Sequence, residues 1–159
     1  MVKRVLASGV LVLSLVGVVV AAEAIKLDLK DFKLTAADGK ENSQLVGYNA
    51  DEMRIYFYTN GVGKVEVTAP AEGDYTLTLR ASCDAAGKEF AKIKVKLNDK
   101  DVKESFELTQ AEAKEYKFDV KLKKGANALH VEFLNDKFKE NEYDLNFFLH
   151  AVTFDTKPK

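Results

Sequence analysis

Hydrophobic and polar residues alternate with a period of two along six segments of this chain. In each segment every second residue is apolar, and charged residues, Thr or His fill most positions between. The six segments are residues 25–30, 64–68, 75–81, 92–97, 117–122 and 129–133. Such alternation predicts β-strands with one buried face and one face in water. No segment sustains a helical period, and residues 109–114 are expected to form one helical turn at most.

Turn-forming residues separate these segments. They include Asp38-Gly39, Asn60-Gly61, Glu72-Gly73-Asp74, Ala86-Gly87, Asn98-Asp99 and Lys124-Gly125. Such residues adopt tight-turn backbones readily. Short strands joined by turns of this kind predict an all-β fold, an antiparallel β-sandwich of the jelly-roll type. The sequence contains no linker or repeat, so we expect one such domain over residues 25–156.

The segment from residue 53 to residue 58 is apolar or aromatic on both of its faces. As a strand it places Met53, Ile55 and Phe57 on one side, and Tyr56 and Tyr58 on the other. We favour a central strand that is covered on both faces. The alternative is an exposed tyrosine pair on which a flat ligand could stack. A second apolar segment, residues 145–154, is expected to form the last strand.

The first residues predict export. Lys3 and Arg4 precede an apolar run over residues 5–20, and the small residues Ala21, Ala22 and Ala24 follow it. This order predicts a secretory signal peptide, residues 1–22. The alternative is an uncleaved membrane anchor, but the run is short of the roughly 20 apolar residues that a spanning helix needs. We expect a protein that is secreted or lies in the periplasm or cell envelope, with no membrane attachment after cleavage.

The charge balance of the chain excludes one class of partner. The sequence has 24 basic and 25 acidic residues, and removing Lys3 and Arg4 leaves 22 basic residues and a net charge of −3. No basic field exists to attract nucleic acid, so no nucleic-acid partner is expected. The single cysteine, Cys83, permits no intrachain disulfide.

The sequence offers little support for an enzyme. His130 lies on the polar face of a predicted strand and His150 lies in an apolar one, and neither has a recognisable catalytic partner. No serine elbow, phosphate-binding loop or His-Glu metal motif is present. Glycoside cleavage by Asp136 and Asp144 would require a substrate cleft between them. We therefore expect a protein that is not an enzyme.

The connection over residues 133–146 is too long for a tight hairpin between its flanking strands and is rich in oxygen ligands. It contains four carboxylates and three amides: Asp136, Glu140, Glu142, Asp144, Asn135, Asn141 and Asn146. Calcium takes six to eight oxygen ligands of this kind in irregular geometry. The alternative is a solvated acidic loop balanced by Lys137 and Lys139.

Four parts of the sequence together resemble a known family. They are Gly73–Ala81, Ala91–Asp101 with its Asn98-Asp99 turn, Lys124–Asp136, and Asp144-Leu145-Asn146 before the last strand. Over roughly residues 62–154 their order and spacing are similar to the calcium-dependent, xylan-binding type of carbohydrate-binding module. That family typically shows an Asn-Asp pair, a short loop and then Asp-Arg-Asn-Leu. Here Leu145 stands in place of the arginine and Phe147 in place of the leucine.

The resemblance implies a calcium ion, held in the loop, that also contacts sugar hydroxyls. It implies that Asp136 and Asp144 bind the metal ion and also belong to the carbohydrate-binding site. Asn135 and Asn146 match the motif, as metal ligands or as supports for the loop backbone. Separately from the motif, Glu140 and Glu142 are counted as additional metal-binding oxygens in the loop.

Aromatic contacts to a sugar would come from the rim of the same loop, because the chain has no tryptophan. Phe138 and Tyr143 are the candidates for carbohydrate contact, and the alternative is that both pack within the loop. The leading hypothesis is non-catalytic, calcium-assisted binding of a polysaccharide or oligosaccharide outside the cytoplasm. The alternative is a structural or protein-interaction sandwich of the cell envelope with at most a structural ion. No protein partner is predicted.

Overall fold

The computed structural model describes residues 23–41 and 44–157, so the predicted leader lies outside the described residues. The described chain forms one short 3₁₀ helix, Leu29–Asp31, and antiparallel strands. The strand predicted over residues 25–30 is therefore wrong beyond Lys26, because the Asp28 side chain accepts from Lys30 N–H and caps the 3₁₀ helix. The strands are β1 (Ile25–Lys26), β2 (Lys33–Ala36), β3 (Val46–Asn49), β4 (Arg54–Phe57), β5 (Gly61–Ala69), β6 (Gly73–Cys83), β7 (Lys92–Leu97), β8 (Lys100–Glu107), β9 (Lys114–Leu122), β10 (Gly125–Phe133), β11 (Lys137–Lys139), β12 (Tyr143–Leu145) and β13 (Phe147–Thr156). No helix among these residues is long and apolar enough to cross a membrane.

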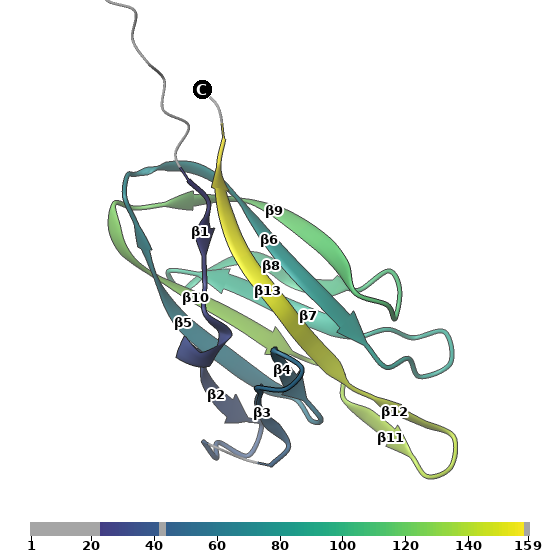
Figure 1. The fold of residues 1–159 in the computed structure, drawn as a ribbon. Helices are drawn as coiled ribbons and strands as arrows, with labels where there is room; N and C mark the ends of the chain where they lie inside the picture. Colours follow the sequence, from purple (N-terminus) through teal and green to yellow (C-terminus); the bar gives the residue numbers. More distant parts are fainter. Residues whose placement is uncertain (1–22, 42–43, 158–159) are drawn as a thin grey trace, which may run out of the picture.

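Two sheets pack face to face, which confirms the predicted β-sandwich (Figure 1). Sheet A has the order β3-β4-β13-β6-β9, with β1 also paired to β13. Sheet B has the order β2-β5-β10-β7-β8. The third pair, β11 and β12, forms a hairpin that projects beyond the sandwich, at the end opposite to the start of β1 and the end of β13 (Figure 1).

The core follows the predicted alternation. In β5 and β10 every second residue is buried between the sheets, and the residues between them are half-buried or exposed. Aromatic rings join the two sheets at the hairpin end of the sandwich. The ring centroid of Phe147 in β13 lies 5.5 Å from that of Phe57 in β4 and 5.9 Å from that of Phe133 in β10. All three rings are 0–1% exposed, so they stabilise this end of the sandwich by burial.

Residues 109–113 form an irregular loop, without the single helical turn that the sequence allows there. The backbone groups of this segment bond to other elements instead of to each other. The N–H of Thr109 donates to the hydroxyl of Tyr116, and the carbonyl of Ala111 accepts from Cys83 N–H. These bonds replace the hydrogen bonds that a helical turn would make.

The favoured interpretation of residues 53–58 is also wrong. Ile55 and Phe57 are fully buried, but Arg54 and Tyr56 on the other face are only half-buried, and Tyr58 is 40% exposed. β4 is therefore covered on one face and open on the other. The alternative, a tyrosine pair at the surface, describes the structure.

We expect Phe147→Ala to lower the free energy of unfolding by about 3–5 kcal/mol, because it leaves a cavity between Phe57 and Phe133. Urea denaturation followed by far-UV circular dichroism measures this change. Phe138→Ala is the matched control, since the Phe138 side chain is 70% exposed; its effect should stay within about 0.5 kcal/mol. Equal effects of the two substitutions would contradict the assigned core.

Candidate functional site

The segment that carries the predicted metal ligands folds as the β11–β12 hairpin. Its turn is closed by a hydrogen bond of 3.0 Å from Glu142 N–H to the carbonyl of Lys139. Asn141 takes the left-handed conformation that the turn requires, with φ of 60°. The hairpin continues directly into β13 through Asn146, so it is built on the strand that organises sheet A.

The register of the hairpin decides which side chains share a face. Phe138 pairs with Asp144, and Lys137 pairs with Leu145. Extending this register by one residue brings Asp136 opposite Asn146. Directly opposed residues lie on the same face, and successive residues alternate between faces. Asp136, Phe138, Asp144 and Asn146 therefore share one face, which we call the ligand face.

Asp136 is held at the base of this face by the turn between β4 and β5. Its backbone N–H donates to Asn60 Oδ1 at 2.7 Å, and its carboxylate is hydrogen-bonded to the Thr59 side chain. Burial raises the pKa of Asp136 above its ordinary value, and the nearby negative charge of Asp144 raises it further; the bonds to Thr59 and to the backbone of Lys137 act in the opposite direction. Asp136 Oδ1 is buried without a hydrogen-bond partner.

Asn146 carries a second buried oxygen without a partner. Its Nδ2 donates to Asp84 Oδ2 at 3.0 Å and to the carbonyl of Asp144 at 3.4 Å. The backbone carbonyl of Asn146 accepts from Asp84 N–H at 3.1 Å. Because a carboxylate and a carbonyl both need a donor, these contacts fix the orientation of the amide. Asn146 Oδ1 is thereby left without a hydrogen bond.

These oxygens fit a hard cation. Both unpaired atoms are acceptors, and a buried acceptor without a donor costs about 1–3 kcal/mol. Calcium binds carboxylate, amide and backbone carbonyl oxygens together. Within the described residues no three His, Cys, Asp or Glu side chains cluster as a metal site. A cation here would therefore depend on a mixed set, the carboxylates of Asp136 and Asp144 with the amide oxygen of Asn146.

Asn135, the other motif asparagine, faces away from this cluster. Its Oδ1 accepts from Lys92 N–H at 2.6 Å, and its Nδ2 donates to the carbonyl of Phe90 at 3.0 Å and to Glu89 Oε1 at 3.3 Å. Lys137, on the same side of the hairpin, bonds Glu89 Oε2 at 2.6 Å. The Lys137 and Asn135 hydrogen bonds hold the pKa of Glu89 below its ordinary value. Asn135 thus anchors the hairpin to the start of β7.

Glu140 and Glu142 lie at the turn of the hairpin, away from its base. Glu142 pairs with Lys139 at 2.5 Å. At about 3.3 Å per residue, Glu140 is on the order of 13 Å along the strand from Asp136, its fourth neighbour. Calcium ligands lie within about 2.6 Å of the ion, so the structure does not bring these two carboxylates to the cluster.

The two candidate aromatic residues lie on opposite faces. Phe138 is on the ligand face, paired with Asp144 and 70% exposed. Tyr143 pairs with Lys139 on the other face and is half-buried. The structure therefore brings Phe138 to the candidate cation ligands and directs Tyr143 away from them.

The two departures from the family motif fall in the core. Leu145 and Phe147 are both fully buried, at 0% exposure, while Asp144 and Asn146 alternate with them. The two side chains that differ from the motif point inward, whereas Asp144 and Asn146, which match it, lie on the ligand face. Replacing arginine by Leu145 therefore alters the packing beneath the site.

Three residues of the cluster were missed in the sequence. Asp84 follows β6, and Thr59 and Asn60 form the turn between β4 and β5. The sequence predicts only a turn at Asn60-Gly61. These residues reach the site because β6 and β4 are both paired to β13, a contact over long sequence separation that no local pattern shows.

Comparison with known proteins gives one family match. Residues 76–158 match the sequence profile of family 60 of the carbohydrate-binding modules, described as "Ca-dependent carbohydrate-binding module xylan-binding". The matched region includes the whole hairpin, Asp84 and β13, but not Thr59 and Asn60. None of the curated proteins matches the chain.

Solved structures share the fold at low identity. A family 35 module from Clostridium thermocellum has a TM-score of 0.58 and 17% identity, covering 86% of this chain and 100% of that chain. A family 36 domain of a xylanase from the hindgut metagenome of Trinervitermes trinervoides has a TM-score of 0.60 and 11% identity, covering 86% and 98%. A family 36 module in complex with calcium and xylotriose has a TM-score of 0.58 and 12% identity, covering 84% and 100%.

We expect Asn135→Ala to lower the free energy of unfolding by about 1–3 kcal/mol, because Lys92 N–H and the carbonyl of Phe90 lose their partner. Urea denaturation without added metal measures this effect. Asn141→Gly is the control, since glycine takes the left-handed turn conformation without strain. An unchanged free energy of unfolding with a lost calcium response would show that Asn135 is a metal ligand and not an anchor.

Proposed function

Because this chain belongs to the calcium-dependent, xylan-binding family of carbohydrate-binding modules, we propose that it binds a polysaccharide through a calcium ion at the base of the β11–β12 hairpin. Family membership makes it a non-catalytic carbohydrate-binding module. The finer proposal concerns the ion, the residues that hold it and the place where the protein acts.

One observation carries the proposal: the buried, unpaired Oδ1 atoms of Asp136 and Asn146 on the ligand face. The Asp136 and Asp144 carboxylates and the Asn146 amide oxygen would hold the calcium ion. Such an ion would supply open coordination positions for sugar hydroxyls, since calcium accepts six to eight oxygen ligands and tolerates irregular geometry. Asp84 orients the Asn146 amide, so we assign it as a positioning residue.

Phe138 is the proposed aromatic contact. A phenylalanine that is 70% exposed beside Asp144 leaves its apolar ring in water. Covering that ring with the C–H face of a sugar would recover part of the roughly 1.5–3 kcal/mol that burial of such a side chain provides. Tyr143, on the other face, is assigned no sugar contact.

We further propose that residues 1–22 are a cleaved leader and that residues 25–156 are the exported module. The basic start and apolar run of the sequence support this assignment. An exported site would meet extracellular calcium, for which modules of this kind have affinities on the order of 0.1–1 mM. The family also supports a location where polysaccharide is accessible, outside the cytoplasm.

We expect binding of xylohexaose to require both calcium and Asp144. Isothermal titration calorimetry with calcium should give a measurable affinity, which EDTA or Asp144→Ala should abolish, because the ion bridges protein and sugar. Asp119→Ala is the matched control, since Asp119 is a carboxylate of β9 paired with Lys157. Thermal stabilisation by calcium without sugar binding, across a panel of glycans, would favour a structural ion and contradict the proposal.

We expect Phe138→Ala to weaken sugar binding about tenfold, which corresponds to roughly 1.4 kcal/mol of lost contact. Tyr143→Ala should bind sugar as the wild type does, because its ring lies on the other face of the hairpin. The same calorimetric titration in calcium measures both variants. A larger loss for Tyr143→Ala than for Phe138→Ala would show that the assigned faces are wrong.

A further inference from the structure

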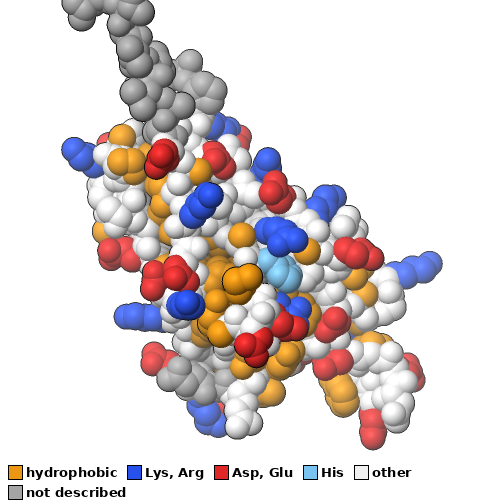
Figure 2. Space-filling model, in the orientation of Figure 1, with side chains coloured by type: hydrophobic (Ala, Val, Ile, Leu, Met, Phe, Trp, Pro, Cys, Tyr) orange, Lys and Arg blue, Asp and Glu red, His pale blue; other side chains and the backbone are white. Residues whose placement is uncertain are grey.

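The outer face of sheet A, next to the hairpin, carries an aromatic surface. The ring centroids of Tyr56 and Tyr58 are 4.7 Å apart with planes 28° from parallel, and Tyr58 meets Phe148 edge-on at 6.2 Å. Tyr58 is 40% exposed. We call these three residues the aromatic platform. Figure 2 shows a hydrophobic patch on this side of the molecule with a histidine at its border.

Glycine at position 47 permits the platform. Gly47 in β3 is paired with Tyr56 in β4, so the two residues share the outer face. A Cβ at position 47 would lie 2.4 Å from Tyr56 Oη and 2.7 Å from Cζ, closer than atoms pack. The Tyr56 ring therefore lies across the backbone of β3, and the adjacent Tyr58 ring stacks on it. This arrangement exists before any ligand arrives.

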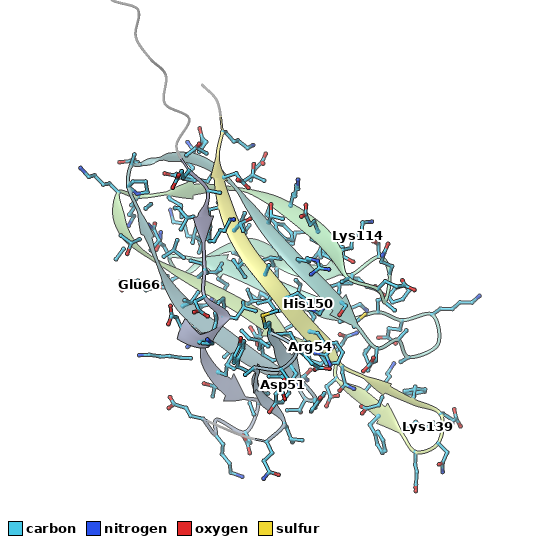
Figure 3. The ribbon with its side chains drawn as sticks, viewed as in Figure 1. Asp51, Arg54, Glu66, Lys114, Lys139 and His150 are labelled. Carbon is cyan, nitrogen blue, oxygen red and sulfur yellow. The ribbon has the colours of Figure 1, made fainter. Side chains whose placement is uncertain are left out.

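Polar groups border the platform and are already paired with each other. The Arg54 guanidinium lies 4.0 Å from the centre of the Phe148 ring and forms an ion pair of 2.7 Å with Glu52. Ser82 Oγ and His150 Nε2 are 2.7 Å apart. Figure 3 shows Arg54 and His150 close together on neighbouring strands.

The charge at the border of the platform is partly balanced, and Arg80 adds a further positive charge near His150. Glu52 balances the charge of Arg54. Burial lowers the pKa of His150, the positive charges of Arg80 and Arg54 lower it further, and Glu52 opposes this. The lowered pKa favours the uncharged imidazole, which with the Ser82 hydroxyl offers neutral hydrogen-bonding groups. Such a surface suits a neutral ligand with hydroxyl groups and an apolar ring face.

The platform adjoins the ligand face of the hairpin. Phe148 lies two residues after Asn146, which immediately precedes β13, and Ser82 lies two residues before Asp84, which immediately follows β6. Tyr58 immediately precedes Thr59, whose side chain bonds Asp136. A strand advances about 3.3 Å per residue, so two residues that follow each other on one face, i and i+2, are roughly 7 Å apart. A chain bound at the hairpin could therefore continue over the platform.

We propose that the aromatic platform is a second contact surface for the polysaccharide chain, one that needs no metal ion. Sugar rings of a neutral chain stack on the exposed face of the Tyr58 ring, which Tyr56 supports from beneath, and their hydroxyls bond to Arg54, Ser82 and His150. This inference rests on the proposed function, because it takes the ligand of the hairpin site and extends it. The affinity should therefore depend on the length of the oligosaccharide. Short oligosaccharides reach only the hairpin, and longer ones reach both surfaces.

Titration of Tyr58→Ala with xylobiose and xylohexaose, in calcium, tests this assignment. The wild type should bind xylohexaose about tenfold more tightly than xylobiose. Tyr58→Ala should lose that difference and bind xylobiose unchanged, whereas Asp144→Ala should lose both sugars. Tyr58→Phe is the matched control and should behave as the wild type, because it keeps the ring.

The outcomes separate this inference from the proposed function. Equal affinities of wild type and Tyr58→Ala for xylohexaose, with xylobiose binding intact, overturn the platform and leave the hairpin site standing. Failure of the wild type to bind either sugar overturns both. Thermal unfolding of each variant checks that it folds. If Tyr58→Ala does not fold, Tyr58→Thr replaces it, because threonine favours extended backbone.

Discussion

The pairing of β13 with β6 and β4 is the constraint on which both the core and the candidate site depend. β13 lies antiparallel to β6 from Phe147, opposite Cys83, to Thr156, opposite Tyr75. Because side chains alternate along a strand, this register sends Phe147 into the core and leaves Asn146 on the outer face beside Asp84. A slip of one residue would exchange the two faces, so core burial and site geometry are fixed by the same backbone bonds.

The shared strand also separates the residues of the core from those of the site. Leu145 and Phe147 must pack in the core, whereas Asp144 and Asn146 supply oxygen atoms to the ligand face. Alternation separates the two requirements residue by residue. The effect of a substitution at position 145 therefore depends on side-chain volume and hydrophobicity. The effect of a substitution at position 144 depends on charge and on the oxygen atoms that the side chain offers.

The sequence predicts most of the core strands, the sandwich and the segment that carries Asp136 and Asp144, since alternation, turns and oxygen-rich composition are local properties. It does not predict β2, β3 and β8, whose residues show no clear alternation. It cannot place Asp84 or Thr59 at the site, because only long-range strand pairing brings them there. Glu140 and Glu142 were grouped with the metal ligands by composition, but a hairpin in place of an open loop carries them away from its base. The sequence favours burial of Tyr56 and Tyr58, because hydrophobicity alone does not show that the outer face of β4 is left open to solvent.

The hairpin is held in place without help from a cation. Glu89 bonds Lys137 and Asn135 on one side of the hairpin, while the unpaired oxygens of Asp136 and Asn146 belong to the ligand face. Two buried acceptors left unpaired cost about 1–3 kcal/mol each, which the sandwich must offset from a total stability of about 5–15 kcal/mol. A cation that binds them loses little free energy to ordering of the site, because the hairpin is already held in place.

The aromatic platform is also preformed, because Gly47 leaves room for the Tyr56 ring. Its contacts to a sugar are stacking contacts, which no ion strengthens. Affinity at the hairpin should therefore vary with calcium, whereas the contribution of the platform should vary with the length of the chain that crosses it.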